Sequence, residues 1–391
     1  MAQHGFVFRK GRSWFLRYRE DVPVDGKKVR KQKCVKLADY CDRYRRESDL
    51  ADLVEEKLAG VRAAEKCPQS SDSFIDYTEN VYLAYVQRKM KASTYDGYKT
   101  HFERYIKPRV AKYALRDFTV SIVSSLLDDI CNMHHMNTKT IGKVRSILSA
   151  IFTYAMAKGN FPGKSASENP ASKAMIPESA SEPRQTVAAS REQVKGILAA
   201  LKDMPLERAA VAIVAMLGVR PSEARGLLWR DWNRAKDQIQ VARSVWHAIE
   251  GTTKTPQSVR LLAVSAELRD VLLPLWKKQN SPLDGYILAG PRRNKPVILD
   301  NLAKRTIRAR LEEVNRKEKS NLAWPGWYSL RRFHGTAVRA ESNLETTSRA
   351  LGNSRGVADR HYVRPSEVLP DVRKAVNDAV SGLTDVQRAC N

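Results

Sequence analysis

The sequence predicts a multidomain α+β protein in which a small three-stranded sheet with one helix precedes a helical domain and a mostly helical domain with a small antiparallel sheet. The 391 residues suffice for two or three domains at the usual ~100 to 200 residues each. A Pro- and Ser-rich stretch without periodicity, residues 162–185, marks a domain boundary. The class follows from the apolar pattern, because two-residue alternation near the start changes to helical spacing afterwards.

The charge balance narrows the choice of partner. The net charge of +25, from 68 Lys and Arg against 43 Asp and Glu, is too large for a neutral metabolic enzyme and favours a polyanion, nucleic acid first. A membrane surface also attracts cations, but no apolar run approaches the ~20 residues of a spanning helix. The start "MAQHGFVFRKGR" lacks the apolar segment of a signal peptide. We therefore expect a soluble, intracellular protein with no membrane partner.

The cysteines are scattered without a CxxC pair, so neither a zinc site nor a disulfide framework is indicated. No metal site is expected from them. We expect reduced thiols at Cys34, Cys41, Cys67, Cys131 and Cys390.

Residues 1–66 are expected to form the first sheet and its helix. Apolar and aromatic residues occur in two short runs around a turn at Gly11, a second turn is expected at "DGKK", and "VRKQKCVKLA" alternates again. From about Arg43, leucines at helical spacing predict a helix that closes over the sheet. Residues 1–36 hold eleven Lys or Arg and three acidic residues. This is either a solvated basic face or, because the charges alternate with aromatics on strands, a surface that grips a DNA groove.

Residues 74–175 are expected to be helical. Four aromatic residues of "STYDGYKTHFERYI" lie three and four positions apart, and Pro108 ends that helix. A second helix is expected at roughly 119–132, and a third ends at Gly159. Helices of this kind usually form a core.

Residues 186–391 begin with a helix in which "SREQ" fits a capping box. An apolar helix then ends at Gly218, and Pro221 opens the next helix at its first position. Arg220 therefore lies at a helix junction, where Glu223 one turn later can hold its guanidinium.

Two strands are expected farther along, at "DQIQVARSVWHAI" and "SVRLLAV", joined by a stretch that contains Lys254. A lysine on such a hairpin is ordinarily a surface residue. The stretch "WYSLRRFHGTAVRA" predicts a helix with Tyr328 and Arg331 on one face. In "LGNSRGVADRHY", Tyr362 stands nine positions after Asn353, and by itself it is either a packed aromatic residue or a nucleophile.

The order and spacing of these stretches resemble those of the tyrosine recombinase family, of the phage integrase type. The family's first box, Gly-Leu/Met-Arg-x-Ser-Glu, occurs as "LGVRPSEARGLLWRD", its hairpin lysine in "TKTPQSVRLLAV", and its second box, His-x-Leu-Arg, as "YSLRR". The third box, Leu-Gly-His followed nine residues later by tyrosine, occurs as "LGNSRGVADRHY". Arg331 also precedes Asn353 by 22 residues, the family's typical separation. The resemblance extends over the whole chain.

The resemblance implies three domains: an arm-type DNA-binding domain at 1–66, a helical core-binding domain at 74–175, and a catalytic domain with a C-terminal tail at 186–391. The implied partners are double-stranded DNA with core-type and arm-type sites, a homotetramer formed on that DNA, and accessory DNA-bending or directionality factors. Such a protein is bacterial or phage-encoded and acts in the cytoplasm at the nucleoid, without a cofactor. Residues after about 366 are either a helix exchanged between neighbours or a helix packed on its own domain.

The residue types of the boxes suit strand cleavage. Displacement at a DNA phosphodiester builds charge on two nonbridging oxygens, which two arginines can clamp. Attack by a tyrosine then leaves a 3′-phosphotyrosyl link, a lysine protonates the departing oxygen, and no metal or ATP is needed. By the resemblance, the catalytic residues are Arg220, Lys254, Tyr328, Arg331, Asn353 and Tyr362, with Glu223 supporting Arg220.

Two positions depart from the family pattern. Tyr328 and Asn353 stand where the family ordinarily has histidine, or tryptophan in the second case. Both side chains can donate a hydrogen bond, but neither carries protons near neutral pH as imidazole does. His334 and His361 lie nearby in the sequence and are either substitutes for this role or ordinary packed or surface residues.

The sequence therefore predicts a site-specific DNA recombinase, an integrase that integrates or excises a mobile element. Two alternatives stay open. A type IB topoisomerase-like enzyme shares the chemistry but does not exchange strands, and the added arm-binding domain argues against it. A degenerate, non-cleaving DNA-binding protein would account for the two missing histidines.

Overall fold

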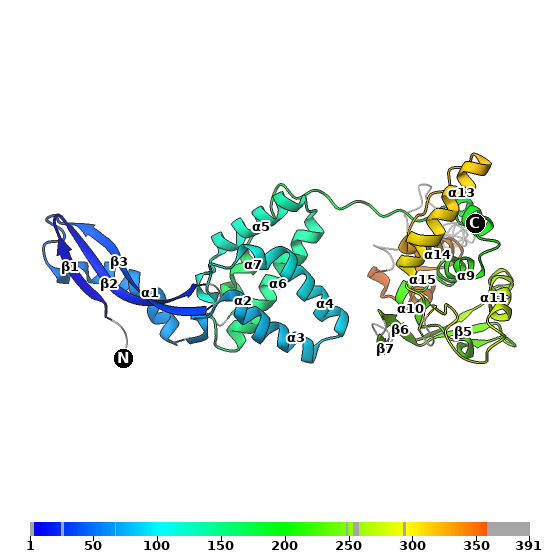
Figure 1. Cartoon of the computed structure of the whole chain (residues 1–391), viewed down its shortest axis with the longest axis horizontal. Coiled ribbons are helices and arrows are strands. Elements are labelled where there is room, and N and C mark those ends of the chain that lie inside the picture. Colours follow the sequence, from blue (N-terminus) through cyan, green and yellow to red (C-terminus); the bar gives the residue numbers. More distant parts are fainter. Residues whose placement is uncertain are drawn as a thin grey trace, which may run out of the picture. The chain divides into compact units, whose positions relative to one another are not determined.

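The chain folds into two compact units, Met1–Arg184 and Gln185–Asn391 (Figure 1). Among the described residues, no helix is long and apolar enough to cross a membrane. The computed structural model describes residues 4–24, 27–66, 68–163, 165–247, 249–252, 258–291 and 295–357.

The first unit begins with the predicted three-stranded sheet, which is antiparallel in the order β1-β2-β3. Gly11 takes the left-handed conformation, φ +60°, in the turn between β1 and β2. Leu16 of β2 and Leu58 of α1 are both fully buried, so the helix covers one face of the sheet, as expected from its leucine spacing. The elements are β1 (Phe6–Lys10), β2 (Ser13–Val24), β3 (Lys27–Asp39) and α1 (Ala51–Lys66).

The rest of the first unit is helical, as predicted. Its core is aromatic: Phe74 lies 4.3 Å from Phe118 and 5.7 Å from Phe152 between ring centroids. Thr119 and Asn137 cap the two longest helices of this core through their side chains. The helices are α2 (Phe74–Asp76), α3 (Leu83–Lys89), α4 (Ala92–His101), α5 (Val120–His134), α6 (Thr138–Ala157) and α7 (Pro170–Lys173), with π-helical stretches at Tyr77–Tyr82 and Phe102–Ile106.

The short helix α7 lies within the Pro- and Ser-rich stretch 162–185, which we expected to mark a domain boundary and for which we expected no helix. Asn169 accepts hydrogen bonds from the Ala171 and Ser172 amides, and its own amide donates 2.8 Å to the Ser149 carbonyl of α6. Ala171 is fully buried. The first half of the stretch is therefore fixed on the helical core by one polar side chain, which no apolar periodicity would reveal.

The second unit surrounds one apolar helix. Eight residues of α9 are buried, and the helix packs against α11 and α14. A three-stranded antiparallel sheet of order β4-β5-β8 and a β6-β7 hairpin confirm the predicted small antiparallel sheet. The helices are α8 (Arg191–Ala200), α9 (Pro205–Leu217), α10 (Pro221–Gly226), α11 (Ala266–Lys278), α12 (Leu299–Leu302), α13 (Arg308–Glu318), α14 (Trp327–Glu341) and α15 (Leu344–Leu351); the strands are β4 (Trp232–Asn233), β5 (Gln238–Val241), β6 (Arg243–Trp246), β7 (Ile249–Thr252) and β8 (Arg260–Ala263).

The predicted capping box of α8 is only half formed. The Ser190 hydroxyl accepts from the Gln193 amide at 3.1 Å, as expected. The Gln193 side chain, however, donates to the Ala323 carbonyl at 3.0 Å instead of reaching back to Ser190. A tertiary contact has therefore replaced the local one.

Candidate active site

The site begins at the junction between α9 and α10. Gly218 ends α9 in the left-handed conformation, φ +62°, and Pro221 is the first residue of α10. Arg220 between them caps α10: its amide donates to Glu223 Oε2 at 2.9 Å, and its Nη1 donates to Glu223 Oε1 at 2.5 Å. Glu223 thus binds both the amide and the guanidinium of Arg220.

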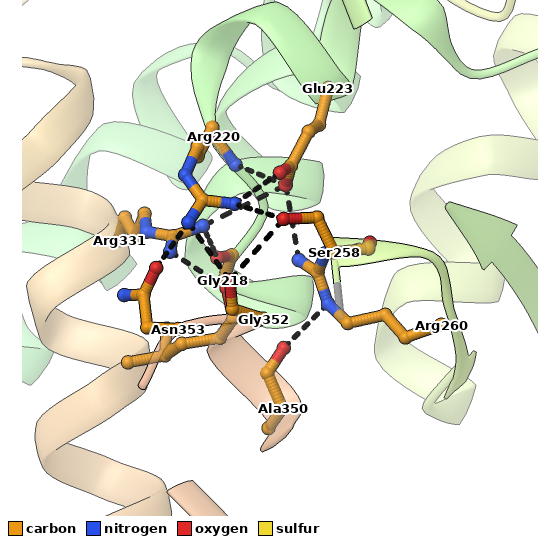
Figure 2. A network of polar contacts seen from close by, with 10 residues as sticks. Gly218, Arg220, Glu223, Ser258, Arg260, Arg331, Ala350, Gly352 and Asn353 are labelled. Atoms are coloured by element: carbon orange, nitrogen blue, oxygen red, sulfur yellow. Dashed lines mark hydrogen bonds and ion pairs between the residues drawn. The ribbon is translucent and has the colours of Figure 1, made fainter. Parts of the chain in front are cut away.

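Glu223 is a buried carboxylate, 1% exposed, that faces three guanidinium groups. Arg260 Nη2 lies 3.1 Å and Arg331 Nη1 3.8 Å from its Oε2, in addition to the contact with Arg220. Burial alone would raise the pKa of Glu223, but the three cations, Arg260 most strongly, hold that pKa below its ordinary value. Glu223 is therefore ionised at neutral pH and joins the three arginines (Figure 2).

Arg331 comes from α14 and is fully buried. Its Nη1 donates to the Gly218 carbonyl at 2.7 Å, and its Nη2 donates to the Leu351 carbonyl at 2.8 Å. These contacts fix Arg331 between the end of α9 and the end of α15. Arg220 and Arg331, 111 positions apart in the sequence, thus meet at one carboxylate.

Asn353 lies in the turn that follows α15, where Gly352 takes the left-handed conformation, φ +61°. Arg220 Nη2 donates to the Gly352 carbonyl at 2.9 Å and to Asn353 Oδ1. Because a guanidinium can only donate, this contact sets the orientation of the amide. Asn353 Nδ2 is then a buried donor with no hydrogen-bond partner in the described part of the chain. The turn thus presents an unused amide donor beside Arg220.

Tyr328 is the second residue of α14, one turn before Arg331, and it is 50% exposed. It lines a cavity of about 750 Å³ together with Pro221 and Ser222 of α10. A phenol on the wall of an open cavity next to the Arg220 junction is accessible to a ligand.

Two of the predicted catalytic residues, Lys254 and Tyr362, lie outside the described residues, as do His361 and the expected C-terminal helix. The structure brings together four predicted site residues, which are Arg220, Glu223, Arg331 and Asn353, and places Tyr328 on the same helix as Arg331.

His334 lies one turn after Arg331 and packs against the end of α9. A Cβ on Gly218 would come 2.3 Å from the His334 ring, so only glycine fits that position. Burial, with the charges of Arg331 and Arg260, lowers the pKa of His334 to about 4. His334 is therefore neutral near pH 7 and is a packing residue, poorly suited to carry the protons that the missing histidines would carry.

Sequence reasoning missed Arg260 and Ser258. Arg260 is 8% exposed and binds Glu223, while Ser258 is fully buried and lies 3.4 Å from Arg220 Nη1. Their signal in the sequence is a polar residue at the first two inward positions of "SVRLLAV", where apolar residues would be ordinary.

Chemically, the site presents two guanidinium groups and one amide donor within a largely buried network. Such donors suit an anion with several oxygens, because planar guanidinium groups bind phosphate or carboxylate in pairs of hydrogen bonds. Among the described residues, no group of three or more His, Cys, Asp or Glu side chains is placed to hold a metal ion.

The fold and this network define a class: the chain has the fold of integrases, and the predicted fold is confirmed. The Tn1549 transposon integrase in complex with transposon right end DNA matches with a TM-score of 0.63 and 15% identity, over 77% of this chain and 98% of that chain. A lambda integrase dimer bound to a COC′ core site matches with a TM-score of 0.58 and 15% identity, over 93% of this chain and 97% of that one. A lambda integrase tetramer bound to a Holliday junction matches with a TM-score of 0.55 at 15% identity, over 86% of this chain and 92% of that one. No protein-family profile and no curated protein sequence matches the chain.

Proposed function

We propose that the chain is a site-specific DNA recombinase of the tyrosine recombinase family, an integrase that integrates or excises a mobile element. One observation carries the proposal. Arg220, Arg331 and Asn353 meet around Glu223, from positions up to 133 residues apart, inside an integrase fold. A chance likeness of fold would not require the polar residues of three sequence boxes to converge.

In the proposed reaction, the Tyr362 oxygen attacks the scissile phosphorus as the phenol gives up its proton to water. The bond from phosphorus to the 5′ oxygen breaks, and Lys254 donates a proton to that oxygen, which leaves a 3′-phosphotyrosyl link and a free 5′-hydroxyl. Arg220 and Arg331 offset the charge that develops on the nonbridging oxygens, and Asn353 Nδ2 supplies a further donor. The Tyr328 hydroxyl, on the wall of the open cavity, is a candidate hydrogen-bond donor to the phosphate. Because the link keeps the energy of the phosphoester, a 5′-hydroxyl from another strand can reverse the step without a cofactor.

The proposed division of labour follows the three expected domains. Residues 74–175 and 186–391 hold a core-type site, and residues 1–66 hold an arm-type site. The first sheet supports this role: Arg17 lies over the Phe8 ring at 4.9 Å and Arg9 over the Tyr40 ring at 4.6 Å. Stacking holds these basic side chains extended, as suits contact with phosphates. We further propose a homotetramer on DNA in the cytoplasm, at the nucleoid, with accessory DNA-bending or directionality factors.

Covalent trapping on a nicked suicide substrate, made from DNA flanking the gene, tests the proposal. The wild-type protein is expected to form a complex that survives denaturant and persists in EDTA. Tyr362→Phe removes only the hydroxyl, so it should bind DNA equally well and form no such complex. Arg220→Ala and Arg331→Ala should each slow cleavage by about 100-fold or more, because each removes a charged clamp. A Phe variant that still crosslinks would rule out Tyr362 as the nucleophile.

A non-cleaving DNA-binding protein is the second candidate, favoured by Tyr328 and Asn353 at the usual histidine positions. It predicts tight DNA binding with no covalent complex from the wild-type chain. A type IB topoisomerase-like enzyme predicts the covalent complex and relaxation of supercoiled DNA, without exchange between two duplexes.

A further inference from the structure

We propose that Arg260 is a positioning residue for strand cleavage, because it ties the carboxylate of Glu223 to the turn 350–353 and so fixes the two arginines that both groups hold. The inference rests on the proposed function and adds a residue to which no motif assigns a role.

The contacts of Arg260 are all with the protein. Its Nη2 donates to Glu223 Oε2 at 3.1 Å, its Nε to the Ala350 carbonyl at 2.8 Å, and its Nη1 to the Ser258 carbonyl at 2.8 Å. Each nitrogen of the guanidinium thus donates to a group of the protein, which fixes Arg260 between Glu223, the turn after α15 and its own strand. Burial lowers the pKa of Arg260 against the pull of Glu223, but a guanidinium still stays protonated in proteins.

The two groups that Arg260 joins are those that hold the other arginines. Glu223 binds Arg220 directly and lies 3.8 Å from Arg331. The turn 350–353 supplies one carbonyl to Arg331 and the next carbonyl to Arg220. Arg260 thus connects the carboxylate on α10 to the turn after α15 independently of the two arginines that must meet the phosphate (Figure 2).

The turn also passes close over Arg260. A Cβ on Gly352 would lie 2.8 Å from Arg260 Nη1, and the backbone there has φ +61°. Only glycine therefore allows the backbone at position 352 both to take this conformation and to pass so close to the guanidinium. A displacement of about 1 Å near a reacting centre can cost roughly 100-fold in rate, so such a support affects chemistry without touching the substrate.

Single-turnover cleavage of the suicide substrate by the full-length protein tests this role. Arg260→Met keeps the length of the side chain but removes its charge and donors, and we expect cleavage to slow by about 10- to 100-fold with DNA affinity unchanged. Arg260→Lys keeps the charge but lacks the planar arrangement of donors, so its cleavage rate should lie between those of the wild type and Arg260→Met. Arg310→Met is the matched control, because Arg310 also binds a backbone carbonyl and two carboxylates in this unit, away from the network. It should cleave at the wild-type rate.

The pH profile separates positioning from a general loss of structure. Among the described residues, the charged groups that face Glu223 are Arg220, Arg260 and Arg331, and removal of Arg260 is expected to raise the pKa of Glu223. As pH falls, Arg260→Met should lose cleavage at a higher pH than the wild type does. In a Glu223→Gln background, Arg260→Met should slow cleavage much less than it does in the wild-type background, because the carboxylate that Arg260 positions is already absent.

Four outcomes are decisive. An Arg260→Met variant that cleaves within about twofold of wild type, or one whose profile on the acid side does not move, overturns the positioning role. A variant that is slow only because it melts at the assay temperature, with an unchanged rate per folded molecule, also overturns it. If the wild-type chain itself forms no covalent complex, the proposed function fails first and this inference falls with it.

Discussion

At the scale of single residues, Asn353 is the position where the structure most sharpens the expected chemistry. Its Oδ1 accepts from Arg220, and its Nδ2 is a buried donor without a partner among the described residues. Asn353→Asp keeps the acceptor and loses the donor, while Asn353→Ala loses both. Each should slow single-turnover cleavage by about 100-fold or more, the cost of one preorganised donor. Asn353→His restores a donor and should cleave at least as fast as wild type near neutral pH.

Thermal melting, measured on the same variants, provides the control for Asn353. If the residue only stabilises the turn after Gly352, Asn353→Ala would melt lower and still cleave at the wild-type rate. That result would remove Asn353 from the active site.

Part of this site could be predicted from residues that are close together in the sequence. The Arg220–Glu223 pair follows from a cap and a residue three positions later, so both its existence and its geometry could be predicted. That Arg331 would lie at the turn that contains Asn353 was expected only through the spacing of the family boxes. The role of Arg260 and the unused Asn353 donor depend on contacts between residues 37 or more positions apart, which no local pattern encodes.

His334 leads to a prediction about stability. Its folded pKa of about 4 lies below the ordinary 6.5, so between these values the unfolded chain binds more protons than the folded one. Stability from this residue is therefore complete above pH 6.5 and is lost as pH falls toward 4, by up to about 3 kcal/mol. His334→Gln should lose less stability across this window. Urea unfolding followed by tryptophan fluorescence reports on the second unit, which holds six of the seven tryptophans. If the wild type and His334→Gln lose the same unfolding free energy between pH 6.5 and 4, the lowered pKa of His334 is contradicted.

At the scale of elements, a largely buried ion pair joins the first sheet to the helical part of the first unit. Arg116 Nη2 lies 2.9 Å from Glu20 Oε1 of β2, and Arg116 Nη1 donates to the Ser71 hydroxyl at 2.9 Å. Lys33 of β3 also contacts Glu20. The side chains of Arg116 and Glu20 are 10% and 15% exposed, so the pair is shielded from solvent and salt.

Arg116→Met should therefore loosen the sheet from the helices. The substitution leaves Glu20 paired only with the half-exposed Lys33, so we expect a cost below the ~3 to 5 kcal/mol of a buried charge left with no partner. Trypsin should release the N-terminal sheet faster from this variant, as read by mass spectrometry. Lys107→Met is the control, because its pair with Glu79 is half exposed and lies within the helical part. Equal rates of release for both variants and the wild type would show that the pair does not hold the sheet.

The elements themselves were largely predictable, and the exceptions have physical causes. The helices α5 and α6 were expected from apolar spacing and local caps, and the strands β1 to β3 from alternation and turns. The helix α7 was missed because Asn169 holds it through contacts to α6. The prediction that the Gln193 side chain would bond back to Ser190 was wrong, because that side chain donates to the distant Ala323 carbonyl. In both cases a tertiary contact outweighed the local rule.

At the scale of the whole molecule, the net charge of +25 is spread over a chain with two compact units and an especially basic first segment. If residues 1–66 bind arm-type DNA independently of the core site, their deletion should remove arm binding. The deletion should also leave cleavage of a short core-site duplex largely intact. Affinity of the full-length protein for DNA with both sites should fall steeply with salt, by ~0.9 per phosphate contact on logarithmic axes, and the deletion should flatten this slope.

The Arg116→Met variant makes the deletion experiment interpretable. Deletion removes the basic sheet and also uncovers Arg116, whereas Arg116→Met disrupts only the contact with Glu20. Filter binding on separate arm-type and core-type duplexes should show loss of arm binding in the deletion alone, with Arg116→Met close to wild type, because affinity for phosphates resides in the basic strands and not in their attachment. If Arg116→Met loses arm binding as fully as the deletion does, the sheet needs its attachment to bind. If the deletion binds arm DNA unchanged, residues 1–66 are not the arm-binding domain.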